Sequence, residues 1–190
     1  MPVTIRVARQ QNKMGTIMPT TTLRWWKRSA KKVHMFDTWN DSARSALVNI
    51  FGLVVSSKQD TAEPIRQGLD EFISSLYDRP GGEQRAMAHF ASIGADTVQV
   101  AKNRGINLTL VQVHQTLVRK QKDYGPENIR RFGRKGLLIR LHDKVARLEN
   151  LDGGGRDPEN ESVIDTFLDI IGYCAIGIMW ERDEFLLPVV

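Results

Sequence analysis

The spacing of apolar residues along the chain predicts helices over most of its length. Ile65, Leu69, Phe72 and Leu76, for example, recur every three to four positions and therefore lie on one side of a helix. The same spacing covers six segments: 38–56, 62–77, 83–103, 107–122, 137–151 and 161–181. The sequence therefore predicts an all-α fold in which the last three helices pack as one bundle.

Turn and cap residues separate these helices. Pro80 and the two glycines after it interrupt the chain between the second and third segments, because proline and glycine disfavour helix continuation. Asn107 and Asn160 are predicted N-caps, since an asparagine side chain accepts hydrogen bonds from the free backbone N–H groups of a first turn. Residues 123–136 are predicted to form a basic loop, and residues 152–155 are predicted to end the fifth helix.

The composition is that of an ordinary folded protein. The 190 residues are 41% hydrophobic and 26% charged, which excludes wholesale disorder. A single cysteine excludes a disulfide scaffold and a cysteine-rich zinc site. The sequence has no uninterrupted run of 18 apolar residues and no apolar leader at its start, so we expect no membrane span and a cytoplasmic protein.

Positive charge is concentrated at the start of the chain. The net charge is +5, and residues 1–36 contain eight Lys and Arg and no acid. An irregular basic arm of this kind either binds polyanions such as nucleic acid weakly and without sequence choice, or is a solvated leader. The sequence thus divides into a basic N-terminal arm (1–36), a helical region (37–104) and a second helical domain (105–190).

The last predicted helix carries regularly spaced acids in an otherwise apolar sequence. Glu161, Asp165 and Asp169 are each four residues apart and so share one face of the helix. A helix that is apolar nearly all round is buried, and three carboxylates on one buried face need counter-charge. That counter-charge is either a divalent cation that prefers oxygen ligands, Mg²⁺ or Mn²⁺, or the Lys and Arg side chains of a neighbouring helix.

Basic residues are abundant in the preceding part of the sequence. Residues 119–147 contain ten Lys and Arg but three acids, and Arg140, Lys144 and Arg147 share one face of a predicted helix. A basic face opposite an acidic helix is the arrangement that a metal–polyphosphate group needs. The metal neutralises the phosphate, while Arg and Lys hold its outer oxygens.

Three motifs in this region carry a resemblance to a known family. They are KDYG at Lys122, followed by Asn128, then RLHDKVARL at Arg140, and ESVIDTFLDIIGY at Glu161. In this order they resemble the phage and bacterial nucleotide-modification-associated domain, over roughly residues 106–180. That domain is similar to the all-α nucleotide pyrophosphatases typified by MazG and the dimeric dUTPases. The resemblance implies a MazG-like helical bundle that assembles as a homo-oligomer.

The function that the resemblance implies is a Mg²⁺-dependent nucleoside triphosphate pyrophosphohydrolase. Such an enzyme is a hydrolase of acid anhydrides that cleaves the bond between the α and β phosphates of a (deoxy)nucleotide. It would act in phage or bacterial nucleotide metabolism, in the host cytoplasm if phage-encoded. The family's metal site is built from carboxylate pairs on two helices. Glu161 and Asp165 match the second pair and are the expected catalytic residues, whereas the first pair is matched by Asp143 alone. The expected metal ligands are Asp143, Glu161, Asp165 and Asp169.

The expected substrate contacts come from the same motifs. Tyr124 or Asn128 is expected to contact the base or sugar, and the basic side chains to contact phosphate. The full expected binding set is Lys122, Asp123, Tyr124, Gly125, Asn128, Arg140, Lys144 and Arg147. One alternative stays open, a non-catalytic module that binds a nucleotide or nucleic acid, or that docks on a phage assembly. The thin acid set of the first helix favours this module, and the acid stripe of the last helix favours the enzyme.

Overall fold

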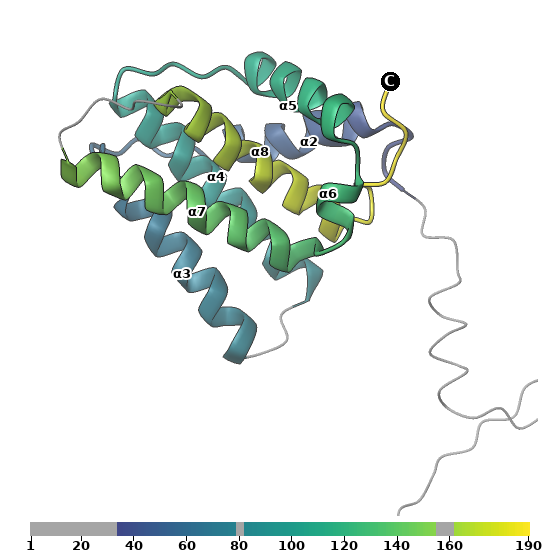
Figure 1. The fold of residues 1–190 in the computed structure, drawn as a ribbon, viewed down its shortest axis with the longest axis horizontal. Coiled ribbons are helices and arrows are strands. Elements are labelled where there is room, and N and C mark those ends of the chain that lie inside the picture. The colour runs from purple at the N-terminus through teal and green to yellow at the C-terminus, as the bar shows by residue number, and fades with distance from the viewer. Residues whose placement is uncertain (1–33, 79–81, 155–161) are drawn as a thin grey trace, which may run out of the picture. The chain divides into compact units, whose positions relative to one another are not determined.

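The computed structural model describes residues 34–78, 82–154 and 162–190, and these residues form an all-α fold (Figure 1). Within these ranges there is no strand. Most of the predicted basic arm lies outside the described residues, as does Glu161. The helices are α2 (Trp39–Gly52), α3 (Glu63–Asp78), α4 (Glu83–Asn103), α5 (Leu110–Tyr124), α6 (Glu127–Arg130), α7 (Gly133–Gly154) and α8 (Val163–Glu181).

Helix α8 lies at the centre of this fold. It packs most extensively on α4 and also contacts α7, α2 and α5 (Figure 1). By length and composition α8 could cross a membrane, but most of it is buried inside the bundle, as expected of a core helix. Between residues 170 and 180, all positions except Tyr173 and Trp180 are buried. One chain therefore covers the apolar surface of α8, and this surface does not by itself call for a second copy.

Glycines allow the central helices to approach one another closely. A Cβ atom at Gly177 of α8 would lie 2.6 Å from the ring of Phe90 on α4. A Cβ atom at Gly94 of α4 would lie 3.0 Å from Ile50 on α2. At each glycine, a buried side chain of the neighbouring helix occupies the space that a side chain would need. The two glycines therefore set the distances between α2, α4 and α8.

Two of the predicted helix caps are wrong. Helix α5 begins after Thr109, whose hydroxyl accepts a hydrogen bond from the backbone N–H of Gln112, and the Gln112 side chain accepts one from the Thr109 N–H. This reciprocal capping box moves the start of the helix two residues beyond Asn107. Helix α8 is capped by Ser162, whose hydroxyl accepts from the backbone N–H of Asp165, whereas Asn160 lies outside the described residues.

The predicted basic loop is largely helical. Residues 123–136 contain the end of α5, the whole of α6 and the first turn of α7, and α7 then continues to Gly154 rather than ending at Leu151. Gly133 adopts φ +53° and packs against Trp180, where a Cβ atom would lie 2.7 Å from the indole ring. A glycine within a helix costs only about 1 kcal/mol, so Gly136 does not prevent α7 from starting before Leu137.

The two helical regions expected from the sequence share one core. Buried Glu184, after α8, accepts hydrogen bonds from the Ser42 hydroxyl (2.6 Å) and from the Met35 backbone N–H (3.0 Å). The backbone N–H of Trp39 donates to the carbonyl of Pro188 at 2.9 Å. Residues 34–190 accordingly form a single compact unit, with no packing boundary near residue 104.

A bidentate ion pair joins α3 to α7. Arg66 donates from Nε and Nη2 to the two carboxylate oxygens of Glu149, at 2.8 and 2.6 Å. These hydrogen bonds lower the pKa of Glu149 from its usual value. The pair therefore stabilises the fold at a pH above the ordinary glutamate pKa, and this contribution is lost as the pH falls through the lowered value.

Substituting Gly177 by alanine should destabilise the fold. The new methyl group would overlap the Phe90 ring, and overpacking of this kind costs about 1–3 kcal/mol. The matched control is Gly52→Ala at the end of α2, where a Cβ atom meets nothing within 4 Å and where stability should hold or rise. Urea unfolding of both variants measures the difference. Equal stability of the two variants would contradict the close packing of α4 on α8.

Replacing Glu149 by glutamine should cost stability in a pH-dependent way. At pH 7 we expect a loss of about 0.5–1 kcal/mol, the upper range for a partly exposed pair with bidentate geometry. The loss should shrink as the pH falls below the ordinary glutamate pKa and vanish below the lowered pKa of Glu149 in the folded protein, where the wild-type carboxylate is protonated in both states. Unfolding curves at several pH values test this, with Glu127→Gln in the exposed Arg130 pair as the control. A loss that did not change with pH would rule out the ion pair as its cause.

Candidate functional site

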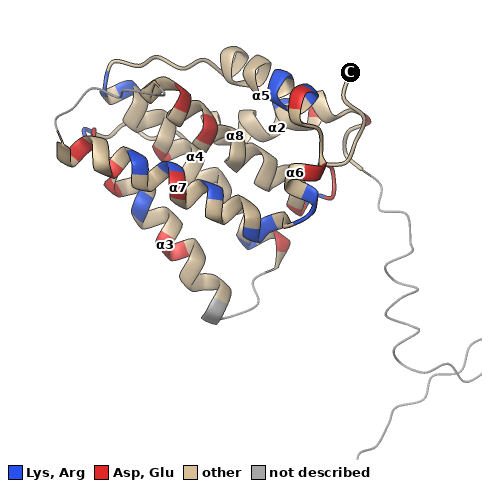
Figure 2. Cartoon of the chain, in the orientation of Figure 1, with Lys and Arg blue, Asp and Glu red and all other residues tan. Residues whose placement is uncertain are grey.

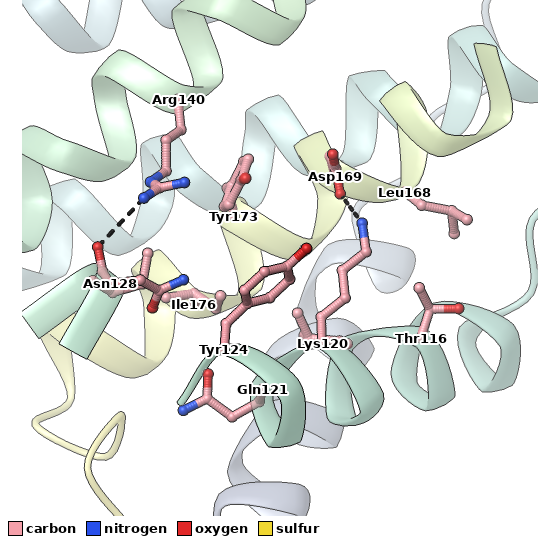
Figure 3. Close-up of a pocket in the computed structure, with 13 residues that line it drawn as sticks. Thr116, Lys120, Gln121, Tyr124, Asn128, Arg140, Leu168, Asp169, Tyr173 and Ile176 are labelled. Atoms are coloured by element: carbon pink, nitrogen blue, oxygen red, sulfur yellow. Dashed lines mark hydrogen bonds and ion pairs between the residues drawn. The ribbon is translucent and has the colours of Figure 1, made fainter. Parts of the chain in front are cut away.

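Four helices enclose a pocket of about 360 Å³ (Figure 3). This volume lies within the range of about 300–1,000 Å³ that small-molecule sites occupy. Its walls come from α5, α6, α7 and α8. The described residues that line it are Thr116, Leu117, Lys120, Gln121, Tyr124, Asn128, Ile129, Arg140, Leu168, Asp169, Gly172, Tyr173 and Ile176.

Helical spacing explains which side chains reach the pocket. On α5, Thr116, Lys120 and Tyr124 are four residues apart, and on α8 Asp169 and Tyr173 are also four apart, so each set occupies one face. Gly125 adopts φ +66°, a conformation that favours glycine, and ends α5 directly after Tyr124. The turn leads into the short helix α6, which brings Asn128 to the pocket.

The pocket combines aromatic rings with cationic side chains. Tyr124 is 70% exposed and reaches from α5 toward α8, where Tyr173 lies (Figure 3). The guanidinium carbon of Arg140 lies 5.8 Å from the centre of the Tyr173 ring, within the range of a cation–π contact. Arg140 also donates to the backbone carbonyl of Asn128 at 3.4 Å, so the residue is held between α6 and α8. Lys120 supplies the second cation of the wall.

The basic face predicted for α7 does contact α8, as expected. Arg140 lies against Tyr173, Lys144 binds Asp169 at 2.8 Å, and Arg147 donates to the hydroxyl of Thr166. These α8 residues follow at spacings of three and four, matching the spacing on α7. Figure 2 shows the Lys and Arg positions of α7 alongside the acidic positions of α8.

Asp169 is paired with two lysines. Lys120 from α5 binds one carboxylate oxygen, and Lys144 from α7 binds the other. The Asp169 side chain is 11% exposed, so the pair of ammonium groups supplies the counter-charge that a nearly buried carboxylate requires. The sequence allowed either a divalent cation or Lys and Arg side chains as the counter-charge. At Asp169 the counter-charge comes from lysine side chains.

The acids of α8 do not share one buried environment, contrary to the expectation. Asp165 is exposed, and its carboxylate accepts a hydrogen bond from the Ser162 hydroxyl at 2.8 Å. The reason is the start of the helix: α8 begins at Val163, so Asp165 lies in the first turn, where the cover from neighbouring helices is incomplete. Glu161 lies outside the described residues.

The described residues do not fit a protein-held magnesium ion. Among residues 34–78, 82–154 and 162–190, no three His, Cys, Asp or Glu side chains gather as a metal site would require. Asp143 on α7 and Asp165 on α8 are both exposed, and both oxygens of Asp169 accept from lysines. The expected ligand set is thus not assembled by the described residues, and a role for Mg²⁺ stays a prediction.

The structure brings together part of the expected binding set and adds residues that the sequence analysis missed. Tyr124, Asn128 and Arg140 line the pocket, whereas Lys122 and Asp123 are exposed and do not. Lys144 reaches Asp169, and Arg147 lies one turn further along α7, at Thr166. The main residues missed are Thr116, Lys120, Gln121 and Tyr173. The spacing of four between Lys120 and Tyr124 was the available signal for the α5 wall.

Cys174 takes no part in this chemistry. It is completely buried in α8, and burial raises the pKa of its thiol far above the ordinary value. A thiol that stays protonated is a poor nucleophile, so we expect this buried cysteine to be inert.

Comparison with protein-family models, with curated proteins and with solved structures finds no match to this chain. The resemblance to the nucleotide-modification-associated domain therefore remains a prediction from the three sequence motifs.

Replacing Asp169 by asparagine should destabilise the protein. The change leaves two ammonium groups without their shared counter-charge, and loss of one partner of a buried polar contact costs about 1–3 kcal/mol. Asp165→Asn, one turn earlier on the same helix, is the matched control and should cost less than about 1 kcal/mol, since that side chain is exposed. Chemical unfolding in EDTA measures both variants without metal. A larger loss at Asp165 than at Asp169 would contradict the arrangement described for α8.

Proposed function

We propose that this chain binds a (deoxy)nucleotide in the pocket between α5, α6, α7 and α8. The observation that supports this most is the joint presence of two tyrosines and two cationic side chains around a volume of about 360 Å³. A nucleotide has the matching parts, a flat aromatic base and an anionic phosphate group.

The base and sugar have suitable partners on one side of the pocket. Tyr124 has a largely exposed ring, and an aromatic ring offers a face on which any base can stack. The Asn128 and Gln121 side chains carry both donors and acceptors, which suits the polar edge of a base. These groups come from α5 and from the α6 segment that follows it.

The phosphates have suitable partners in the two cationic side chains of the wall. Arg140 from α7 and Lys120 from α5 are the cations of the wall, and Arg presents a planar set of donors that matches phosphate oxygens. Among the described lining residues the one carboxylate is Asp169, and its charge is already compensated by two lysines. The wall is therefore cationic on balance, as an anionic ligand requires.

The activity that we propose to test is pyrophosphohydrolysis of nucleoside triphosphates, in nucleotide metabolism, as the resemblance implies. Mg²⁺ would enter as the complex with the triphosphate. The pairing of Asp169 with lysines favours the second candidate, a module that binds the nucleotide without cleaving it. Incubation of the purified full chain with each of the eight common NTPs and dNTPs plus Mg²⁺ separates the two. Release of pyrophosphate and monophosphate identifies the enzyme, and binding without product identifies the module.

Replacing Tyr124 by alanine should weaken nucleotide binding. Loss of one stacking partner costs about 1–3 kcal/mol, so we expect the Kd to rise by about tenfold or more. Phe132→Ala is the control, because Phe132 is similarly exposed, at 65%, but does not line the pocket. Isothermal titration calorimetry on the wild type and both variants measures the Kd values. An equal loss in both variants, or none at Tyr124, would count against this pocket as the binding site.

A further inference from the structure

Asp169 joins three helices through a single carboxylate. Its two oxygens bind Lys120 from α5 and Lys144 from α7, and Asp169 itself belongs to α8. One negative charge thus faces two positive charges at the edge of the pocket. Arg140, also in the pocket wall, adds a third positive charge.

This arrangement disfavours a divalent cation at Asp169. A metal ion binding there would have to displace ammonium groups from both carboxylate oxygens and then remain close to them. The repulsion is strong because the Asp169 side chain is nearly buried, where charges are poorly screened by water.

The same arrangement favours an anion. A lysine ammonium group has three N–H donors, and Asp169 needs one of those of Lys120. Lys120 lines the pocket and its side chain is 41% exposed, so its remaining donors are accessible to a ligand. The carboxylate fixes where the ammonium group lies before a ligand arrives, which lowers the entropy cost of binding.

We propose that Asp169 is a positioning residue that holds Lys120 in place to bind phosphate, so that the pocket binds phosphate-bearing nucleotides without Mg²⁺. This inference rests on the proposed nucleotide-binding function and deepens it. It replaces the expectation that Asp169 ligates a metal ion.

The first experiment compares nucleotide binding with and without metal. Isothermal titration calorimetry on the full chain measures the Kd of a deoxynucleoside triphosphate in excess EDTA and in excess Mg²⁺. We expect the Kd in EDTA to be no more than about threefold weaker, because Lys120 and Arg140 supply the charge that a metal would supply. Binding that requires Mg²⁺ would overturn the inference and leave the proposed function standing. No binding under either condition would overturn the proposed function itself.

The second experiment asks whether Lys120 contacts phosphate. Lys120→Met should weaken triphosphate binding in EDTA by about tenfold, the effect of one charge-assisted hydrogen bond, and leave the affinity for the unphosphorylated deoxynucleoside unchanged. Lys135→Met is the matched control, because Lys135 is an exposed lysine of α7 that does not line the pocket. Equal losses for triphosphate and deoxynucleoside, or an unchanged triphosphate Kd, would overturn the phosphate-binding role of Lys120.

The third experiment separates positioning from charge. Asp169→Asn removes a negative charge from the pocket, so a purely electrostatic role predicts tighter binding of the triphosphate. A positioning role predicts weaker binding of the triphosphate with an unchanged affinity for the deoxynucleoside, because Lys120 loses the group that holds it in place. Circular dichroism of the variant confirms that it is folded under the conditions of the titration. Tighter binding would overturn the positioning role.

Discussion

Burial of helix α8 is the constraint on which the rest of the structure depends. The helix is apolar on nearly every side, so it is stable in water only when neighbouring helices cover it all round. Helix α4 provides most of that cover, and it can do so because Gly177 gives the Phe90 ring room against α8. Helices α7, α2 and α5 complete the enclosure. Helices from both halves of the chain therefore contribute to the cover of α8.

The pocket lies where this cover is made by large polar side chains instead of small apolar ones. Over Tyr173 and Asp169 of α8, the neighbouring helices present Lys120, Tyr124 and Arg140. Long side chains of this kind pack by their stems and leave their polar ends separated, so the space between them is not filled. The short helix α6 then closes one end of the space with Ile129 and Asn128. The ligand site is thus a consequence of how the polar side of the core helix is covered.

Periodicity predicted the helices well because it reports burial directly. The expected segments 62–77 and 83–103 differ from α3 and α4 by at most one residue at each end. The pairing of Arg140 and Lys144 with α8 was also predictable, since both faces follow from spacing alone. The helix boundaries that were predicted wrongly depend on side-chain contacts, which the spacing of apolar residues does not report. Thr109 caps α5 in place of Asn107 because Gln112 reciprocates the hydrogen bond, and α7 begins before Leu137, at Gly133, whose positive φ favours glycine.

The pocket itself was only partly predictable, for a related reason. Tyr124, Asn128 and Arg140 were expected from their motifs, but Lys120 was considered only as one of many basic residues. Its importance comes from Asp169, which lies 49 positions later in the sequence and meets Lys120 only because α5 packs against α8. A contact between side chains this far apart in sequence leaves no spacing signal. Tertiary packing alone selects which of the basic residues reach the site.

Asp165 and Asp169 show what the spacing of residues can predict and what it cannot. Both are aspartates on one face of one helix, so the pattern gives them a common role. Depth along the helix separates them: Asp165 lies in the exposed first turn and binds the Ser162 hydroxyl, whereas Asp169 lies one turn deeper, between two lysines. The cost of burying a charge rises steeply with depth, so one turn of helix is enough to change what each carboxylate must bind. Acids spaced four residues apart are therefore predicted to lie on the same face of the helix. The chemistry of each acid is decided by the helices that cover it.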